Sequence, residues 1–329
     1  MKNFSIAILF CVLAASTAFA KGSNDVVNEK WQRTVLAAVD SFPQGGGYYV
    51  GRKATPDFPR TAWRGLNDAF KMNLVDLAPT FYPQKAQPSF CSLATYAVLI
   101  KALTVYDADS HKISREAWLN MFPFCGIVCD RNPNGLNQAD GEGFWGRANA
   151  NGPAIGVLVN ELKAGFSFTA FRGAKSSKNK ETPDERYMSD DEWRADPVWN
   201  MAQPGDFIKI FWNNNDNGSD NGAVIGVDDV AGDDQEIGHS VIFLGYDSNG
   251  HVRYWSSNGP GKNPKSMGYG IGTCDKTHIQ RVVFTRITHP ENFNSVKSMM
   301  PENVNKWLQS LAGKHHGTTA ELKKYCGIK

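Results

Sequence analysis

A long apolar segment in the first half of the chain constrains the fold most. Residues 89–105 have the sequence Ser-Phe-Cys-Ser-Leu-Ala-Thr-Tyr-Ala-Val-Leu-Ile-Lys-Ala-Leu-Thr-Val, and a helix drawn through them is apolar on most sides. A helix that is apolar all round is buried inside a protein. We therefore expect a central buried helix, reached through an extended stretch that contains Pro79, Pro83 and Pro88.

Hydrophobic spacing and capping residues predict further helices. Ser114 is a good N-cap, and Ser189 with Glu192 forms a capping box. Gly165 follows the end of a helix that has proline in its first turn. The expected helices cover residues 25–42, 61–74, 115–121, 153–164, 190–195, 301–312 and 318–325.

The second half of the chain has strand patterns instead. Residues 247–250, Asp-Ser-Asn-Gly, predict a hairpin turn. Helices followed by an antiparallel meander predict an α+β fold. Because we find no internal repeat or linker, we expect residues 21–329 to form a single domain with insertions. The expected strands cover residues 207–212, 240–246, 252–256 and 279–286.

The first twenty residues predict export. A basic start at Lys2, a short apolar run and Ala18-Phe19-Ala20 are typical of a cleaved signal peptide, so the mature chain should begin near Lys21. No other stretch approaches eighteen apolar residues, so we expect no membrane insertion after the signal is removed. The expected location is periplasmic or extracellular.

The net charge and the spacing of metal-binding residue types restrict the ligands that this chain is expected to bind. The net charge is +2 with no basic stripe, which argues against nucleic acid. Histidines and cysteines lack zinc spacing, so no metal or cofactor is expected. Residues 130–141 begin like a calcium loop but end on Gly141, and a turn-rich loop fits better. The acidic segments 213–220 and 228–236 could hold calcium, but a solvated insertion fits them better.

Five cysteines remain in the mature chain, an odd number that leaves at least one thiol unpaired or in an intermolecular bridge. Cys125 and Cys129 could close a small loop, and Cys274 with Cys326 could hold the C-terminal tail. That pairing would leave Cys91 free, although spacing alone does not fix the connectivity.

Cys91 is the strongest candidate for a chemical role. A thiol attacks a carbonyl carbon well only as thiolate, and a helix N-terminus stabilises that anion. Cys91 falls in the first turn of the expected central helix. The alternative is an ordinary buried cysteine.

His239 is the best candidate for the base that a cysteine nucleophile needs. It stands at the start of the apolar strand Gly-His-Ser-Val-Ile-Phe-Leu-Gly, where a rigid strand can hold its ring. The other six histidines fall in polar, turn or loop contexts. A structural role at a strand start is the alternative.

Three blocks of sequence resemble cell-wall amidases of the NlpC and CHAP types, within the papain-like cysteine hydrolase superfamily. The segment around Cys91, Pro-Ser-Phe-Cys-Ser-Leu-Ala-Thr-Tyr, resembles the nucleophile helix. Pro204-Gly-Asp-Phe-Ile-Lys-Ile-Phe resembles the strand before the catalytic histidine, and the strand with His239 resembles the next one. The resemblance implies a papain-like fold, with the nucleophile helix packed on a C-terminal antiparallel sheet. Residues 21–80 and 290–329 find no counterpart.

Such families orient the histidine with a polar residue on the following strand, which implies a role for Asn258 here. Its amide oxygen can accept a hydrogen bond from the imidazole and fix the tautomer. Ser256 and Ser257 stay open as alternatives.

The remaining site predictions concern substrate. The backbone N–H of Cys91 is one expected oxyanion donor, and Gln87 or Gln84 could supply another. The aromatic and amide side chains of Trp145, Asn151 and Trp255, together with Tyr269, suit a groove for sugars or peptides, although core packing explains the aromatic residues equally well.

Three functions remain open. The first is an exported amidase or endopeptidase that cleaves peptidoglycan stem peptides through a thioester. The second uses Cys91 and His239 on proteins, as a peptidase, deamidase or acyltransferase. The third is a secreted binding protein for peptide or glycan. Whether an inhibitor or immunity protein binds this chain stays open.

Overall fold

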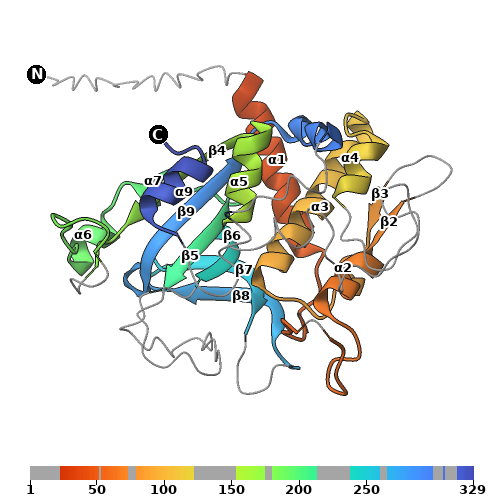
Figure 1. The fold of residues 1–329 in the computed structure, drawn as a ribbon, viewed down its shortest axis with the longest axis horizontal. Helices are drawn as coiled ribbons and strands as arrows, with labels where there is room; N and C mark the ends of the chain where they lie inside the picture. The colour runs from red at the N-terminus through yellow and green to blue at the C-terminus, as the bar shows by residue number, and fades with distance from the viewer. Residues whose placement is uncertain are drawn as a thin grey trace, which may run out of the picture.

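The chain folds as an α+β structure, in which helices of the N-terminal part pack on a sheet built mainly from the C-terminal part (Figure 1). A computed structural model describes residues 23–51, 53–72, 79–121, 153–174, 180–212, 238–259, 265–298, 307 and 317–329. The helices are α1 (Ser23–Asp40), α2 (Ala62–Ala69), α3 (Cys91–Ser110), α4 (Arg115–Asn120), α5 (Ala154–Leu162), α6 (Asp190–Arg194), α7 (Val198–Met201) and α9 (Thr319–Tyr325), with 3₁₀ turns at Pro83–Lys85, Lys276–His278 and Pro290–Ser298.

A seven-stranded antiparallel sheet forms the second layer, in the order β1-β8-β7-β6-β5-β9-β4. Strands β5 to β8 follow one another as the expected meander, and β9 then returns to the free side of β5. A separate pair, β2 (Phe70–Met72) and β3 (Pro79–Phe81), lies beside α2 and α3. The strands of the main sheet are β1 (Gly45–Gly46), β4 (Gly165–Phe171), β5 (Phe207–Trp212), β6 (Gly238–Tyr246), β7 (Val252–Asn258), β8 (Gly268–Cys274) and β9 (Ile279–Ile287).

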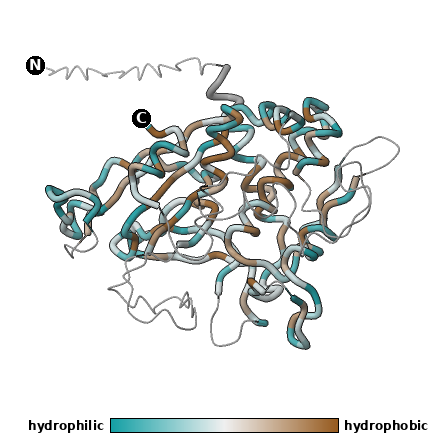
Figure 2. The backbone as a smooth tube through the Cα atoms, viewed as in Figure 1, coloured by the Kyte–Doolittle hydropathy of each residue, from teal (hydrophilic) through white to brown (hydrophobic). Residues whose placement is uncertain are grey.

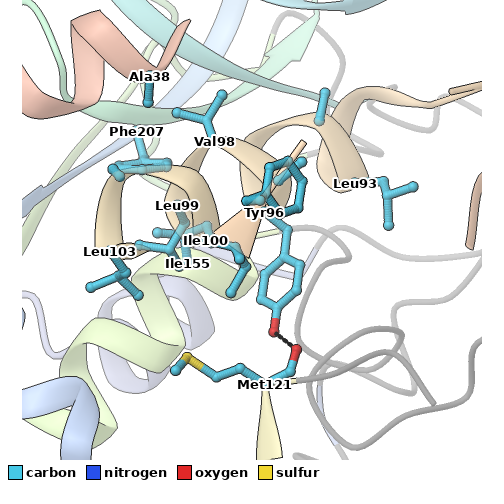
Figure 3. Close-up of a cluster of buried hydrophobic side chains, with 14 of the residues drawn as sticks. Ala38, Leu93, Tyr96, Val98, Leu99, Ile100, Leu103, Met121, Ile155 and Phe207 are labelled. Atoms are coloured by element: carbon cyan, nitrogen blue, oxygen red, sulfur yellow. Dashed lines mark hydrogen bonds between the residues drawn. The ribbon is translucent and has the colours of Figure 1, made fainter. Parts of the chain in front are cut away.

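Helix α3 is the central helix that the apolar segment predicts. It packs against α1, α2, β3, β6 and β7. Its side chains meet residues of α1, α5 and β5 in one cluster (Figure 3), and the hydroxyl of Tyr96 donates to the carbonyl of Met121 at 2.8 Å. Each large aliphatic side chain buried there stabilises the fold by roughly 1.5–3 kcal/mol. By length and composition α3 could also cross a membrane, but most of it is buried inside the protein.

The two faces of the sheet carry different clusters. Phe207, Ile242 and Trp255 face the cluster around α3, whereas Ile208 and Val241 face the tryptophans of the α6–α7 segment. Alternate residues of a strand point to opposite faces, which is why neighbours in sequence enter different clusters. In Figure 2 the hydrophobic colour concentrates on α3 and the central strands, and α6 is hydrophilic.

Local capping follows the sequence closely. Ser114 caps α4, accepting from the backbone N–H of Ala117, and Ser189 with Glu192 forms the expected capping box of α6. The expected helix over 61–74 ends earlier, at Ala69, because the chain turns there into β2. Helix α5 ends at Lys163 in the left-handed conformation, so Gly165 begins β4 and is not part of the cap.

Three strands of the main sheet, β1, β4 and β8, lie outside the expected strands, and β1 is only two glycines long. Strand β8 has glycine at alternate positions 268, 270 and 272, a composition with weak strand propensity, and pairing with β7 along its whole length overrides it. Strand β4 has an alternating aromatic pattern, Gly-Phe-Ser-Phe-Thr-Ala-Phe, that carries a strand signal.

The expected bridge between Cys274 and Cys326 is wrong. Both are free thiols in the structure, and they lie in different hydrophobic clusters, one formed with α6 and α7 and the other with α5 and α9. The signal peptide, the Cys125–Cys129 loop, the calcium-like segments and nearly all of the helix expected at 301–312 lie outside the described residues.

Candidate active site

Cys91 is the first residue of α3 and a partly exposed free thiol. Phe90 is the N-cap residue and has an extended backbone, and its side chain makes no hydrogen bond to the first turn. The first turn contains no acidic residue. The positive end of the helix dipole and its first N–H groups therefore act on the thiol without a competing carboxylate. This position favours the thiolate.

The approach to α3 is held against the sheet by backbone pairing. Ser89 exchanges hydrogen bonds with the segment that follows β1: Tyr49 N donates to Ser89 O at 2.9 Å, and Ser89 N donates to Gly47 O at 3.1 Å. Strand β1 in turn pairs with β8. This places Tyr48 beside Cys91, and Gly259 leaves room for it, since a Cβ at 259 would lie 2.7 Å from Tyr48 Cβ.

His239 lies at the start of β6 and is 3% exposed. Its Nε2 lies 3.1 Å from Oδ1 of Asn258, at the end of β7, while Nδ2 of Asn258 donates to the carbonyl of Gly270 at 2.9 Å. The second bond turns the amide so that its oxygen faces the imidazole. Nε2 therefore carries the proton in the neutral ring, and Nδ1 is left for another partner.

Two aromatic rings enclose the imidazole of His239. Trp212 stacks on it with ring centroids 6.1 Å apart and 27° between planes, and Tyr254 meets it edge-on at 5.6 Å. The register between β5 and β9 shifts between Phe211 and Trp212, a bulge that re-aims the tryptophan. The packing fixes the ring and limits water around its bond to Asn258.

The thiol of Cys91 is acidic for its degree of burial. Burial alone raises the pKa of Cys91, but a hydrogen bond with His239, the positive charges of His239 and Lys209, and the backbone N–H of Ser240 together lower the pKa to about 6. The thiolate form thus predominates at neutral pH, and the three residues that lower the pKa all lie on strands β5 and β6.

The sequence indicated neither Tyr48 nor Lys209 as a site residue. Burial, the charge of Cys91 and a hydrogen bond with its sulfur raise the pKa of Tyr48 well above the usual value, so its hydroxyl stays protonated and can donate to the thiolate. Lys209 lies on β5 opposite Ser240. Tyr48 follows a glycine run and Lys209 interrupts an apolar strand, so each becomes significant only through its neighbours in space.

Of the three residues considered for orienting His239, Asn258 is the one that contacts the ring. Ser256 Oγ donates to the carbonyl of Ser240 at 2.7 Å. Ser257 Oγ is buried without a hydrogen-bond partner among the described residues.

Trp255 does not line an open groove, which corrects its expected role in substrate binding. It is 4% exposed and stacks on Tyr269 at 5.2 Å in the main core cluster. Gln87 is half-buried with its side chain packed on Gly46, and no contact with Cys91 is recorded for it in the described structure. Trp145 and Asn151 lie outside the described residues. Among the residues that are described, no group of three His, Cys, Asp or Glu side chains could hold a metal ion.

Comparison of the chain with protein-family models, with curated proteins and with solved structures found no match. The assignment of a function therefore rests on the chemistry of the site.

Proposed function

We propose that this protein is a papain-like cysteine hydrolase, in which Cys91 is the nucleophile, His239 the acid and base, and Asn258 the residue that orients His239. The observation that carries the proposal is the convergence of these three residues. A thiol at the start of a buried helix interacts with a histidine whose other ring nitrogen is held by an amide. The order of helix, histidine strand and amide strand along the chain supports the papain-like fold.

Acylation follows from this geometry. The Cys91 sulfur attacks the amide carbonyl carbon, and the C=O electrons move to oxygen, forming a tetrahedral oxyanion. The backbone N–H groups at the start of α3 and the Tyr48 hydroxyl lie beside the sulfur and can donate to this oxyanion. Protonated His239 gives its proton to the leaving amine as the C–N bond breaks, which leaves a thioester on Cys91.

Deacylation uses the same groups in reverse. Neutral His239 takes a proton from water, the hydroxide attacks the thioester carbonyl, and the C–S bond breaks to release a carboxylic acid and the thiolate. Asn258 keeps the ring in one orientation through both steps, since its amide is itself anchored to Gly270. The net reaction adds one water across the amide bond.

We further propose that the protein acts outside the cytoplasm on peptidoglycan stem peptides. The N-terminal segment predicts export, and the resemblance of the Cys91 and His239 blocks to cell-wall amidases suggests that substrate. A protein substrate would use the same chemistry, so a digest of each material must decide between them.

The first experiment maps the reactive thiol. The mature protein, kept non-reduced, is treated with iodoacetamide from pH 5 to 9, and labelled peptides are identified by mass spectrometry. We expect rapid labelling confined to Cys91 well below pH 8. Slow labelling with an ordinary thiol profile would favour a non-catalytic binding protein.

Digests of purified peptidoglycan and of unfolded protein then test the reaction. We expect new amino and carboxyl groups from the wild type and from Cys274→Ala, and none from Cys91→Ala. Cys274 is the matched control because it is also a free thiol but lies in a buried cluster. Equal product from the Cys91→Ala variant would overturn the proposal.

A further inference from the structure

Lys209 is a charged residue in the middle of an apolar strand. It lies in β5 within the run Phe-Ile-Lys-Ile-Phe and is 8% exposed. Strand β5 is flanked by β6 and β9, where Ser240 and Val283 are the partners of Lys209. Its side chain lies on the face of Phe207 and Phe211, which is the face covered by α3 and α5.

The ammonium group of Lys209 lies next to the start of β6, the segment whose residues interact with Cys91. A Cβ at Gly238 would collide with Nζ of Lys209, so the glycine makes the space that the ammonium occupies. The residues that follow are His239 and Ser240, which both act on the Cys91 sulfur. A small cavity between α3, α5 and the sheet is lined by Lys209, Ser240 and Thr95, which is one helical turn beyond Cys91.

A buried ammonium needs an anion near it. Burying a lone charge costs several kcal/mol, which a nearby opposite charge must offset. Among the described residues, the charge that acts on the ammonium of Lys209 is that of Cys91, and the ring of Phe211 lies 5.6 Å from Nζ. Burial lowers the pKa of Lys209, and the charge of Cys91 raises it, so the thiolate is the anion that acts on it.

We propose that Lys209 is the buried counter-ion of the Cys91 thiolate and, with His239, sets the pH range over which the nucleophile is charged. The inference rests on the proposed role of Cys91. In the part of the chain that the structure describes, the charged groups that act on the sulfur are His239 from β6 and Lys209 from β5, and the neutral hydroxyl of Tyr48 forms a hydrogen bond with it. The charge of Lys209 comes from a different strand and does not depend on the proton of the imidazole, so it adds a second attraction to the thiolate. Lys209 is thus a positioning residue that acts through the nucleophile.

The test compares the titration of Cys91 in Lys209→Met and in Lys209→Arg. It is followed by thiolate absorbance and by the iodoacetamide rate from pH 4.5 to 9.5. In Lys209→Met the pKa of Cys91 should rise by about one unit, so that labelling at pH 5 slows about tenfold while labelling at pH 9 is unchanged. Lys209→Arg should stay near the wild type. Lys276→Met is the matched control, since Lys276 is half-buried over the ring of Tyr246, away from Cys91.

A reciprocal measurement covers the case in which Lys209→Met does not fold. In Cys91→Ser the NMR titration of the Lys209 Cε signal should move to lower pH, because the anion is gone. An unchanged Lys209 midpoint, or a folded Lys209→Met with the wild-type Cys91 pKa, would overturn the counter-ion role alone. An ordinary thiol profile in the wild type would overturn both this role and the proposed nucleophile. A low pKa without amide cleavage would remove the proposed hydrolysis and leave the counter-ion role standing.

Discussion

The N-terminus of α3 holds the free cysteine Cys91, and the two smaller hydrophobic clusters hold Cys274 and Cys326. The pKa of the thiol is shifted down at the helix and up in the clusters. At the helix, hydrogen bonds and positive charges overcome burial and lower the pKa of Cys91 to about 6. In the clusters, burial raises the pKa of Cys326 to about 12 and, with the charge of Asp275, raises that of Cys274.

The difference shows that burial by itself does not make a cysteine reactive. Cys274 and Cys326 are 6% and 2% exposed in hydrophobic clusters, and burial raises the pKa of both thiols. Cys91 has a helix N-terminus, an imidazole, a backbone N–H and a lysine within reach. The low pKa of the Cys91 thiol therefore depends on the polar groups of β5 and β6.

The largest expected contrast is in labelling rate across the three thiols. With a pKa of about 6, Cys91 is about nine-tenths thiolate at pH 7, against about 3% for an ordinary thiol. Its iodoacetamide rate should rise between pH 5 and 7 and then level off. Cys274 and Cys326 should react at least about a thousandfold more slowly until the protein unfolds. The labelling rates are measured by mass spectrometry. Comparable rates for Cys91 and Cys274 at pH 7 would contradict the expected difference between the helix N-terminus and the clusters.

Replacing His239 should make the thiol of Cys91 less acidic and less reactive, as the thiols of the two clusters are. In His239→Ala, amide hydrolysis should fall by about 10²- to 10⁴-fold, because the acid and base are lost. The pKa of Cys91 should rise at the same time. His251→Ala, in the turn between β6 and β7, is the control and should keep full activity. Both variants are compared by kcat and by the pH dependence of labelling.

A smaller loss is expected at Asn258. Asn258→Ala removes one hydrogen bond worth roughly 1–3 kcal/mol from the imidazole, which corresponds to about a 5- to 150-fold lower kcat. Ser256→Ala, on the same strand, removes a bond to a backbone carbonyl and should change stability more than kcat. If Ser256→Ala lowered kcat more than Asn258→Ala, the orienting role would pass to the serine.

The smallest effect is expected at Tyr48. Tyr48→Phe keeps the ring packing against Gly259 but removes the hydroxyl that donates to the thiolate. The pKa of Cys91 should rise by about half a unit, which lowers labelling at pH 5 about threefold. Tyr49→Phe, which removes a neighbouring hydroxyl bonded to the carbonyl of Lys53, should leave the Cys91 titration unchanged.

Much of the helix and strand content could be predicted, because it depends on local periodicity and caps. A buried helix with Cys91 in its first turn, the capping box at Ser189 and Glu192, and strands β5, β6, β7 and β9 follow from those signals. Strand β8 could not be predicted in the same way, since its glycines carry no side-chain pattern and its pairing is a long-range property.

The residues of the candidate site divide in the same way, into those with a local sequence signal and those that long-range contacts bring in. The sequence by itself determined a cysteine at a helix start, a histidine at a strand start and an asparagine at the end of the next strand, since each depends on local position. Only the tertiary structure decided that Trp255 belongs to the core, that Cys274 and Cys326 lie apart, and that Tyr48 and Lys209 meet Cys91. These contacts join segments far apart in the chain, and strand register and packing, which no local pattern encodes, bring them together.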